Sequence, residues 1–260
     1  MTTGLYVYAV VAGEPADLGT GIDGAALEVV TGPDDVAAVV HRHAAGPYEG
    51  ADDDVRRWVV EHSDVVERVW ERTGTVLPMS FNVIVAEGEE TPARARLQEW
   101  LGAGAQQLRE RLDALKDRVE LRVEIGLDQH QVGGRNPDVV AMQAELETRP
   151  QGVRRLMRKR LDQLEREVTD ALADERYQQY RRRLAAVSEE LSENRSARPG
   201  EGVVSVLTVS LLVPRDAVPG VGRELAAIQD EEPAAVIRYL GPWPPYSFAD
   251  VPGLTAPTMA

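Results

Sequence analysis

The stretch Arg118–Leu127, RVELRVEIGL, decides how the chain is divided. An aliphatic residue occupies every second position, and mostly charged residues stand between. Such alternation predicts a β-strand with one face in the core and one face in solvent. We therefore expect a second module to begin here, with an N-terminal α+β domain at residues 1–115 and a C-terminal domain at 116–241.

Downstream of this strand, the pattern changes from a period of two to helical spacing. A short helix is expected over Asp138–Glu147, and residues 153–194 contain no glycine or proline. About 40 helical residues at 1.5 Å each would span roughly 60 Å, which is too long for one compact layer. Either the helix breaks near Ala173–Tyr177, or part of it projects as a coiled-coil arm.

Two more strands complete the second module. Val203–Pro214 is apolar enough to be buried on both faces, and Ala234–Gly241 is the last strand; a short helix is expected between them, at Asp216–Asp230. The order β–long α–β–α–β predicts helices packed on one face of a small sheet, as in a modified ferredoxin-like unit.

Upstream, the first module mixes strands and helices. Leu5–Val11 is a buried strand by composition, and Leu27–His43 is a hairpin around the turn residues 32–35. A helix is expected from Asp52–Asp54, as N-cap candidates, to about Arg72, and a strand at Thr75–Glu87. Another helix begins at Thr91-Pro92. The residues expected to face the core from the first helix are Val55, Trp58, Val59, His62, Val65, Val66 and Val69. The fold class is α+β, in two domains.

A proline-rich aromatic tail follows the last strand, at residues 242–260. The run Gly241–Asp250, GPWPPYSFAD, holds Trp243, Tyr246 and Phe248, three of only 13 aromatic residues in the chain. Proline excludes a helix or a central strand here, and exposed aromatic side chains are costly in water. The tail must therefore dock, either across the protein's own domains as a staple or on a partner. These three residues are the candidate contact residues.

Composition narrows the function classes. The chain has 260 residues, a net charge of −14 and no cysteine. The negative charge argues against nucleic acid or an anionic membrane as a general partner. The N-terminus has no signal-peptide pattern, and the longest apolar run is about half of the roughly 20 residues that span a bilayer. We expect a soluble cytoplasmic protein.

Motifs that could carry chemistry have simpler structural interpretations. Gly19–Gly24 matches G-x-G-x-x-G but lacks the preceding strand and following helix of a dinucleotide site, so a loop is expected. His41 and His43 could be half of a metal site, but strand-end histidines facing solvent explain them with no further ligand. His62 lies on the apolar stripe, and His130 lies in a polar loop. We expect no catalytic site, no cofactor and no metal, hence no enzyme.

The predicted long helix begins with a basic run. Its residues are Arg154, Arg155, Arg158, Lys159 and Arg160, and acidic residues follow farther along the helix. Nucleic-acid contact conflicts with the global charge, so a solvated helix face or a surface for an acidic protein partner is favoured. Residues alone thus indicate an interaction protein.

The order of these segments resembles the gas vesicle protein L/F family (GvpL/GvpF) over nearly the whole chain. The similar segments are Leu5–Val11, the Gly21–Gly24 loop, Asp34–His43, Glu61–Trp70, Thr75–Val85, Arg118–Leu127 and, most specifically, Tyr239–Asp250 (YLGPWPPYSFAD). One position departs from the family pattern, because Asn82 follows Phe81 where glycine is usual. Asparagine tolerates unusual backbone angles, so the fold is little affected.

The resemblance implies two α+β domains, the second a modified ferredoxin-like one, and a non-enzymatic accessory or minor structural role in gas vesicle assembly. The implied partners are the hydrophobic shell protein GvpA, kept from aggregating during nucleation, and other accessory gas vesicle proteins. The alternative is a stable component of the vesicle wall without chaperone activity. The implied location is the cytoplasm and the gas vesicle, its gas-facing surface included.

Overall fold

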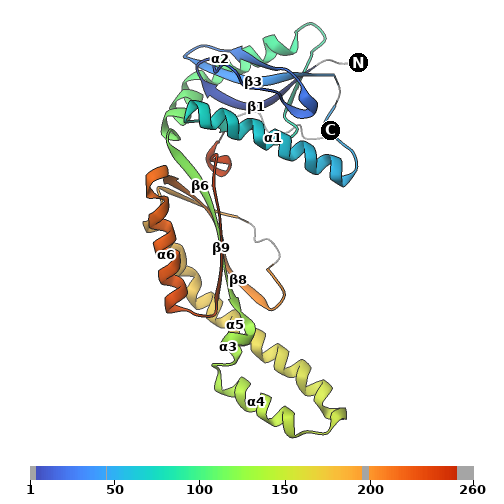
Figure 1. The fold of residues 1–260 in the computed structure, drawn as a ribbon, viewed down its shortest axis with the longest axis vertical. Helices are drawn as coiled ribbons and strands as arrows, with labels where there is room; N and C mark the ends of the chain where they lie inside the picture. The colour runs from blue at the N-terminus through green and yellow to red at the C-terminus, as the bar shows by residue number, and fades with distance from the viewer. Residues whose placement is uncertain (1–3, 45, 195–198, 251–260) are drawn as a thin grey trace. The chain divides into compact units, whose positions relative to one another are not determined.

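The computed structural model of the protein describes residues 4–44, 46–194 and 199–250 (Figure 1). It divides into two compact units: residues 1–120 together with 242–260, and residues 121–241. The last ten residues of the predicted tail, and part of the loop expected between the long helix and the following strand, lie outside the described residues. The α+β fold class predicted from the sequence is confirmed.

The first unit is built on an antiparallel sheet with β1 near its centre. The strand order is β2-β3-β1-β4, and β5 also pairs with β1. β1 is buried from Gly4 to Val11, because strands flank it and two helices, α1 and α2, contact it. The bounds are β1 Gly4–Ala12, β2 Leu27–Thr31, β3 Val36–His43, α1 Asp52–Thr73, β4 Leu77–Pro78, β5 Ile84–Ala86 and α2 Ala93–Ala114.

The predicted hairpin is confirmed, and its turn fixes the register. Asp34 and Asp35 both have positive φ, 55° and 59°, and Val36 N–H donates to the Pro33 carbonyl at 3.2 Å. Two successive left-handed residues form a type I′ turn, whose twist matches that of the flanking strands. The resulting register places Leu27 opposite His41 across β2 and β3. On its other side β3 pairs with β1, where Tyr6 lies opposite His41.

Three details of the first unit differ from the prediction. Val59 is 39% exposed, because α1 is buried along a stripe that starts only at His62. The N-cap of α1 is Ala51, so the three aspartates lie in the first turn, where they favour the helix dipole instead of capping a donor. The strand expected over Thr75–Glu87 is interrupted between β4 and β5, where Asn82 adopts a φ of 70°.

The second unit has a four-stranded sheet in the order β7-β8-β6-β9, with α5 and α6 on one side of it (Figure 1). β8 is buried on both faces from Val206 to Val213, as predicted. The bounds are β6 Arg118–Asp128, α3 Gln129–Gly133, α4 Pro137–Thr148, α5 Gln151–Ala186, β7 Glu190–Glu193, β8 Val203–Pro214, α6 Val218–Glu231 and β9 Ala235–Trp243.

The long helix α5 is unbroken over 36 residues, with no break at Ala173–Tyr177. Its first turns lie beyond the sheet and pack against α4 as an antiparallel hairpin (Figure 1). Its end comes earlier than the expected residue 194, because Glu190–Glu193 forms β7 and pairs with the edge of β8. Leu191 continued the helical spacing in the sequence, but strand pairing opposite Leu211 decides its conformation.

Candidate functional site

The described part of the aromatic tail is bound to the first unit of the same chain. Ser247 donates to the Glu120 carboxylate twice, from its backbone N–H at 2.7 Å and from its hydroxyl at 2.6 Å. The Arg111 Nε donates to the Phe248 carbonyl at 2.7 Å. The Phe248 side chain is 4% exposed, and Glu120 is 6% exposed. Hydrogen bonds to a buried carboxylate are strong, so they fix this turn in place.

The other two tail aromatics remain half-exposed. Trp243, the last residue of β9, and Tyr246, the first of a 3₁₀ turn (η3, Tyr246–Phe248), are each 39% exposed. Burial raises the pKa of the Tyr246 hydroxyl to about 12, although a hydrogen bond with Ser63 of α1 opposes the shift. The three candidate residues therefore differ: Phe248 is an anchor, whereas Trp243 and Tyr246 present aromatic surface.

Aliphatic surface on α1 lies close to Tyr246. Val59 and Val60 are one helical turn before Ser63, the residue that contacts Tyr246, and they are 39% and 57% exposed. Residues three and four apart on a helix share a face. We use the term aromatic surface for Trp243, Tyr246, Val59 and Val60.

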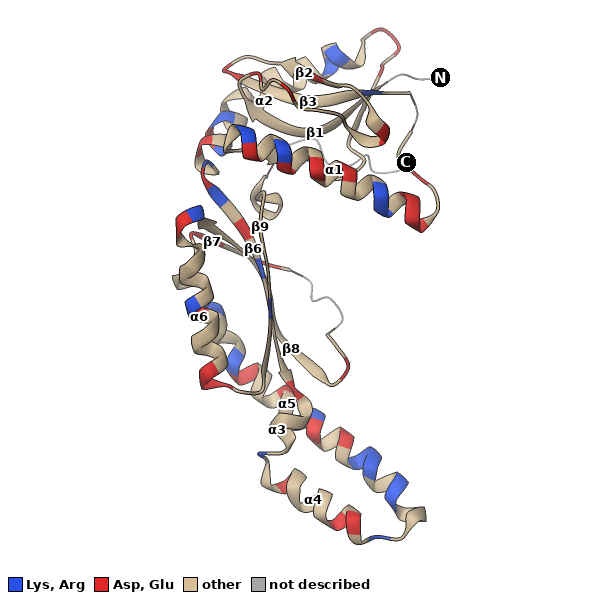
Figure 2. Cartoon of the chain, in the orientation of Figure 1, with Lys and Arg blue, Asp and Glu red and all other residues tan. Residues whose placement is uncertain are grey.

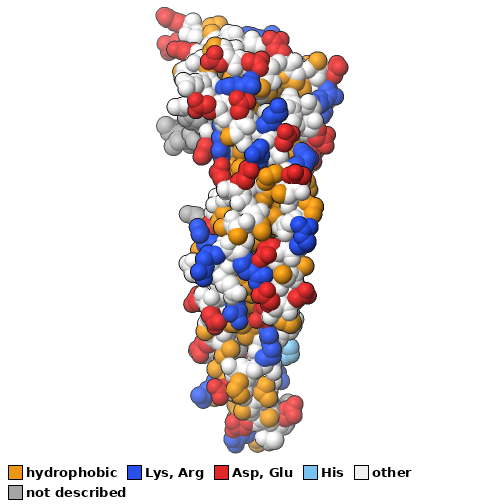
Figure 3. Space-filling view, turned by 90° about the vertical axis from the view of Figure 1, so that its left-hand side faces the viewer, with side chains coloured by type: hydrophobic (Ala, Val, Ile, Leu, Met, Phe, Trp, Pro, Cys, Tyr) orange, Lys and Arg blue, Asp and Glu red, His pale blue; other side chains and the backbone are white. Residues whose placement is uncertain are grey.

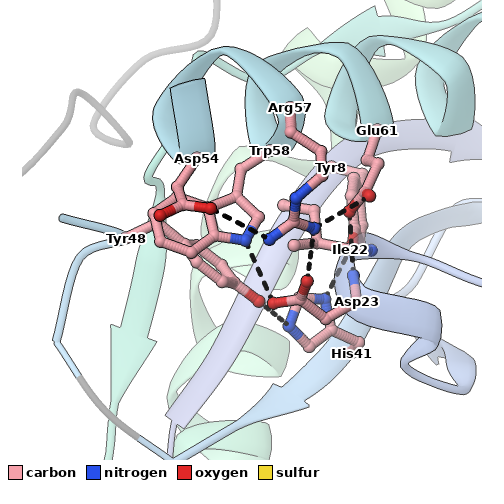
Figure 4. Close-up of polar contacts among 9 residues, drawn as sticks. All are labelled: Tyr8, Ile22, Asp23, His41, Tyr48, Asp54, Arg57, Trp58 and Glu61. Carbon is pink, nitrogen blue, oxygen red and sulfur yellow. Dashed lines mark hydrogen bonds and ion pairs between the residues drawn. The ribbon is translucent and has the colours of Figure 1, made fainter. Parts of the chain in front are cut away.

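A charged cluster joins the N-terminal half of α1 to the loop after β1 (Figure 4). The Asp23 carboxylate accepts from Arg57 Nη1 at 2.5 Å and from the Trp58 indole N–H at 3.0 Å. Glu61 accepts from the Asp23 backbone N–H at 2.9 Å and from Arg57 at 3.0 Å. The bonds from Arg57 and Trp58 hold the pKa of the Asp23 carboxyl below its usual range. The cluster fixes Asp23 in the left-handed conformation, at a φ of 52°.

Below this cluster, a hydrogen-bonded chain runs through the sheet. The Tyr8 hydroxyl accepts from the Ile22 N–H at 2.8 Å and lies 2.8 Å from His41 Nδ1. The other ring nitrogen of His41 lies 3.3 Å from the Tyr48 hydroxyl (Figure 4). His41 is 1% exposed, so the expectation that it faces solvent is wrong. It points into the unit because the pairing of β3 with β1 places it opposite the buried Tyr6.

A second chain joins β1 to α1 and to the segment between β4 and β5. His62 Nε2 lies 3.0 Å from the Met79 carbonyl, which can only accept, so Nε2 carries the proton. Nδ1 is then an acceptor, and the Tyr6 hydroxyl donates to it at 2.9 Å. The same hydroxyl accepts from the Asn82 N–H at 3.1 Å. The prediction of a packed, hydrogen-bonded His62 is confirmed.

Asn82 also holds this segment through its side chain. Its carbonyl oxygen accepts from the Tyr48 N–H at 2.8 Å, and its amide donates to the Tyr48 carbonyl at 3.2 Å. The positive φ at this position confirms the prediction that asparagine can replace the usual glycine. The residue compensates for its backbone strain with two bonds that glycine could not make.

These two hydrogen-bonded chains, through His41 and His62, stabilise the fold of the first unit and are not suited to proton transfer at neutral pH. Burial lowers the pKa values of His41 and His62 to about 4 and raises those of the Tyr6 and Tyr8 hydroxyls. Both histidines are thus neutral and both tyrosines protonated, with no activated nucleophile beside them.

The other motifs noted in the sequence are His43, His130 and the Gly19–Gly24 loop, and neither histidine is part of these hydrogen-bonded chains. His43 contacts the Gly46 carbonyl at 2.7 Å, and His130, expected in a loop, lies in α3 with its side chain 85% exposed. Across the described residues, no group of three or more histidine, aspartate or glutamate side chains is placed to hold a metal ion. The last three residues of Gly19–Gly24 form a 3₁₀ turn (η1, Ile22–Gly24), and β2 follows it.

Sequence reasoning missed the Asp23–Arg57–Trp58 cluster and the roles of Tyr6 and Tyr8. The two tyrosines had a signal, because polar side chains at alternate positions of a fully buried strand need partners. No such signal in the sequence marked Asp23.

No helix within the described residues is both long and apolar enough to cross a membrane.

Comparisons with known proteins agree with the fold and the motifs. The model of the family "Gas vesicle synthesis protein GvpL/GvpF" matches residues 4–250. The chain is 30% identical to gas vesicle protein L2 of Halobacterium salinarum, over 96% of this chain and 92% of the relative. It is similar in fold, at 20% identity each, to crystal structures of the gas vesicle protein GvpF from Microcystis aeruginosa and Anabaena sp. The TM-scores are 0.65 and 0.67, covering 95% and 97% of this chain and 99% and 98% of those chains.

The family match spans nearly the whole chain, and it includes both the segment around Asn82 and the described aromatic tail. The family consists of structural and assembly proteins of gas vesicles and is not a known enzyme family. The chain belongs to the gas vesicle synthesis protein GvpL/GvpF family, whose members take part in gas vesicle formation.

Proposed function

We propose that this protein is an accessory factor of gas vesicle assembly that binds the hydrophobic shell protein GvpA and limits its aggregation during nucleation. A wall that excludes water must be built from apolar subunits, and such subunits aggregate when free. A factor that covers part of the apolar surface of a subunit would keep it dispersed until it is incorporated.

The observation that carries this proposal is the aromatic surface. Trp243 and Tyr246 are half-exposed, yet prolines on both sides and the bonds of Ser247 and Phe248 hold their backbone. A pre-organised aromatic surface loses little conformational entropy on binding, and tryptophan and tyrosine are enriched among residues that dominate binding energy. The partner that fits best has an exposed apolar face.

The charge of the chain supports the same role. A net charge of −14 makes copies of the protein repel one another, so a complex with an apolar subunit stays in solution. We place this activity in the cytoplasm, where the shell protein and other accessory gas vesicle proteins would be the partners. Nucleic acid and lipid are not proposed as partners.

The experiment is co-purification of the shell protein with this protein and with two variants. The double substitution Trp243→Ala and Tyr246→Ala removes the aromatic surface and leaves the anchor Phe248 in place. Tyr239→Ala is the matched control, because Tyr239 is 37% exposed but belongs to the other unit. We expect the double variant to lose at least tenfold in shell-protein recovery, with an unchanged melting temperature, and the control to bind normally.

Two results would contradict the proposal. One is equal recovery of the shell protein by all three proteins. The other is the formation of normal vesicles in a strain that lacks the gene. If instead the double variant mainly loses thermal stability, Trp243 and Tyr246 serve the chain's own packing.

The second candidate function is a stable minor component of the vesicle wall without chaperone activity. The same aromatic surface would then contact assembled shell, at its gas-facing surface or elsewhere. This alternative predicts that the protein stays with intact vesicles through repeated washing, whereas a transient factor is removed.

A further inference from the structure

Charge is distributed in blocks along α5, and the first block stands out. Residues 151–160 carry five basic side chains and no acidic one, whereas residues 161–175 carry six acidic side chains and one arginine. Figure 2 shows the basic block at the end of α5 that packs against α4, and acidic residues on α4 itself. We call α4 together with residues 151–160 the helical arm.

Four of these five cations have no partner among the described residues. Arg154 donates to the carbonyls of Arg149 and Glu147, at 2.6 and 2.9 Å, and so closes the C-terminal end of α4. The others are exposed and form no hydrogen bond or ion pair with any residue that the structure describes; they are Arg155, Arg158, Lys159 and Arg160.

Elsewhere on α5, arginine side chains form ion pairs with glutamates. Near its C-terminal end, Arg176 pairs with Glu175 at 3.0 Å, and Arg181 pairs with Glu193 at 2.6 Å. Arg183 bonds to Glu224 and, at 2.6 Å, to Glu231. A concentration of unpaired cations is therefore a local feature of the arm, in a chain with 14 excess negative charges.

Exposed aliphatic side chains lie among these cations. Leu156 is 73% exposed, more than any other large hydrophobic residue in the described part of the chain. Val153 is 46% exposed, and Val140 of α4 is 45% exposed. At the lower end of Figure 3, where the arm lies, hydrophobic side chains are visible between charged ones. Cations around an aliphatic centre resemble the rim and core of an interface.

We propose that the helical arm is a docking surface for an acidic amphipathic helix of a partner protein. The apolar stripe of that helix would cover Leu156 and Val153. Its carboxylates would pair with Lys159 and Arg160, which lie three and four residues after Leu156 on the same face, and with Arg155, which shares a face with Lys159. Charge complementarity selects an acidic partner, because the four cations are free to pair. The length of α5, about 54 Å, carries its first turns past the sheet, so they are accessible.

Other anionic partners fit the arm less well. Residues 136–160 contain no aromatic side chain on which a nucleic-acid base could stack, and the net charge of the chain repels polyanions. Three aliphatic side chains are too few for insertion into a membrane interface, and aromatic anchors are missing from this segment of the sequence. The surface goes beyond the proposed function, because it belongs to the second unit and would let one chain hold a second partner.

The test is fluorescence anisotropy with a labelled synthetic helical peptide that carries a leucine stripe flanked by glutamates. A control peptide has glutamine at every glutamate. The protein variants are Arg155→Glu/Lys159→Glu/Arg160→Glu and, separately, Leu156→Ala. A second triple variant, Arg56→Glu/Lys116→Glu/Arg223→Glu, changes the net charge equally at exposed sites outside the arm.

We expect the acidic peptide to bind the native protein and the control peptide to bind at least tenfold more weakly. Reversal of the three arm charges should weaken binding by about 10- to 100-fold, and Leu156→Ala by about fivefold. The control triple variant should bind almost normally, and all variants should keep the native circular dichroism spectrum, because the changed side chains are exposed.

Several results would overturn the proposal. These are equal weakening by the two triple variants, equal binding of both peptides, or no binding of the acidic peptide at low salt. Tighter binding of an oligouridylate or of phosphatidylserine vesicles than of the peptide would assign the arm to nucleic acid or membrane instead. Self-association that disappears on arm charge reversal would assign it to a second copy of this chain.

Discussion

Acidification should unfold the first unit through its two buried histidines. In the folded chain the pKa values of His41 and His62 are about 4, lowered from 6.5 by burial. Between pH 6.5 and 4, the unfolded chain therefore binds two protons that the folded chain does not. Stability is full above pH 6.5 and falls as the pH drops through this window.

The size of the effect follows from the shifts. Each pKa unit is worth about 1.4 kcal/mol, so a shift of roughly 2.5 units costs about 3 kcal/mol per histidine by pH 4. Both together approach the whole stability of a typical domain, roughly 5–15 kcal/mol. The steepest loss, near pH 5, should be about 3 kcal/mol per pH unit. Protonated His62 would also lose its acceptor nitrogen, so the bond from Tyr6 could not form.

The assay is urea unfolding at a series of pH values, followed by tryptophan fluorescence. All four tryptophans belong to the first unit, so the signal reports on that unit alone. His62→Asn removes one titrating group and should halve the pH slope, while lowering stability at pH 7.5. His130→Asn is the matched control, because its side chain is 85% exposed in the native chain.

A free energy of unfolding that stays constant between pH 6.5 and 4.5 would refute this reasoning. So would equal slopes for the native chain and His62→Asn, because a shared slope would have to come from carboxylates or from global charge.

Further predictions concern the tail and two strained turns. Glu120→Gln should destabilise the first unit by about 1–3 kcal/mol, because Ser247 would lose its charged acceptor; urea unfolding measures this, and a change below 0.5 kcal/mol would contradict the anchor. Asp34→Gly should stabilise the unit by about 0.5–1 kcal/mol, because glycine accepts a positive φ without strain. Asn82→Gly should instead destabilise it by about 1–2 kcal/mol, since two bonds to Tyr48 are lost; opposite signs for the two substitutions in thermal unfolding are the decisive result.

Local patterns were enough to predict most elements of the fold. The alternation in Arg118–Leu127, the turn residues around Asp34 and the helical spacing of the leucines in α2 each define their element without help from distant residues. β7 was missed because its four residues continue the spacing of α5, and only the exposed edge of β8 makes a strand of them. The exposure of Val59 was missed for a similar reason, since spacing cannot say where along a helix its covered face begins.

The candidate site was less predictable than the fold. Trp243, Tyr246 and Phe248 were singled out by composition, but their different exposures depend on Glu120 and Arg111, more than 120 residues away. The same holds for His41, whose burial depends on pairing across β1 and β3. The unpaired state of the arm cations could not be read from the chain either, because whether they meet an acidic residue is a property of packing.

The sequence by itself determined the α+β class, the acidity of the chain and the aromatic run that marks its family, because all of these depend on composition or on neighbours in the chain. Only the tertiary structure decided which aromatic is an anchor and which is exposed, which histidines are buried, and which cations of α5 are left unpaired. Those outcomes depend on side chains brought together from distant segments, and no local pattern encodes that proximity.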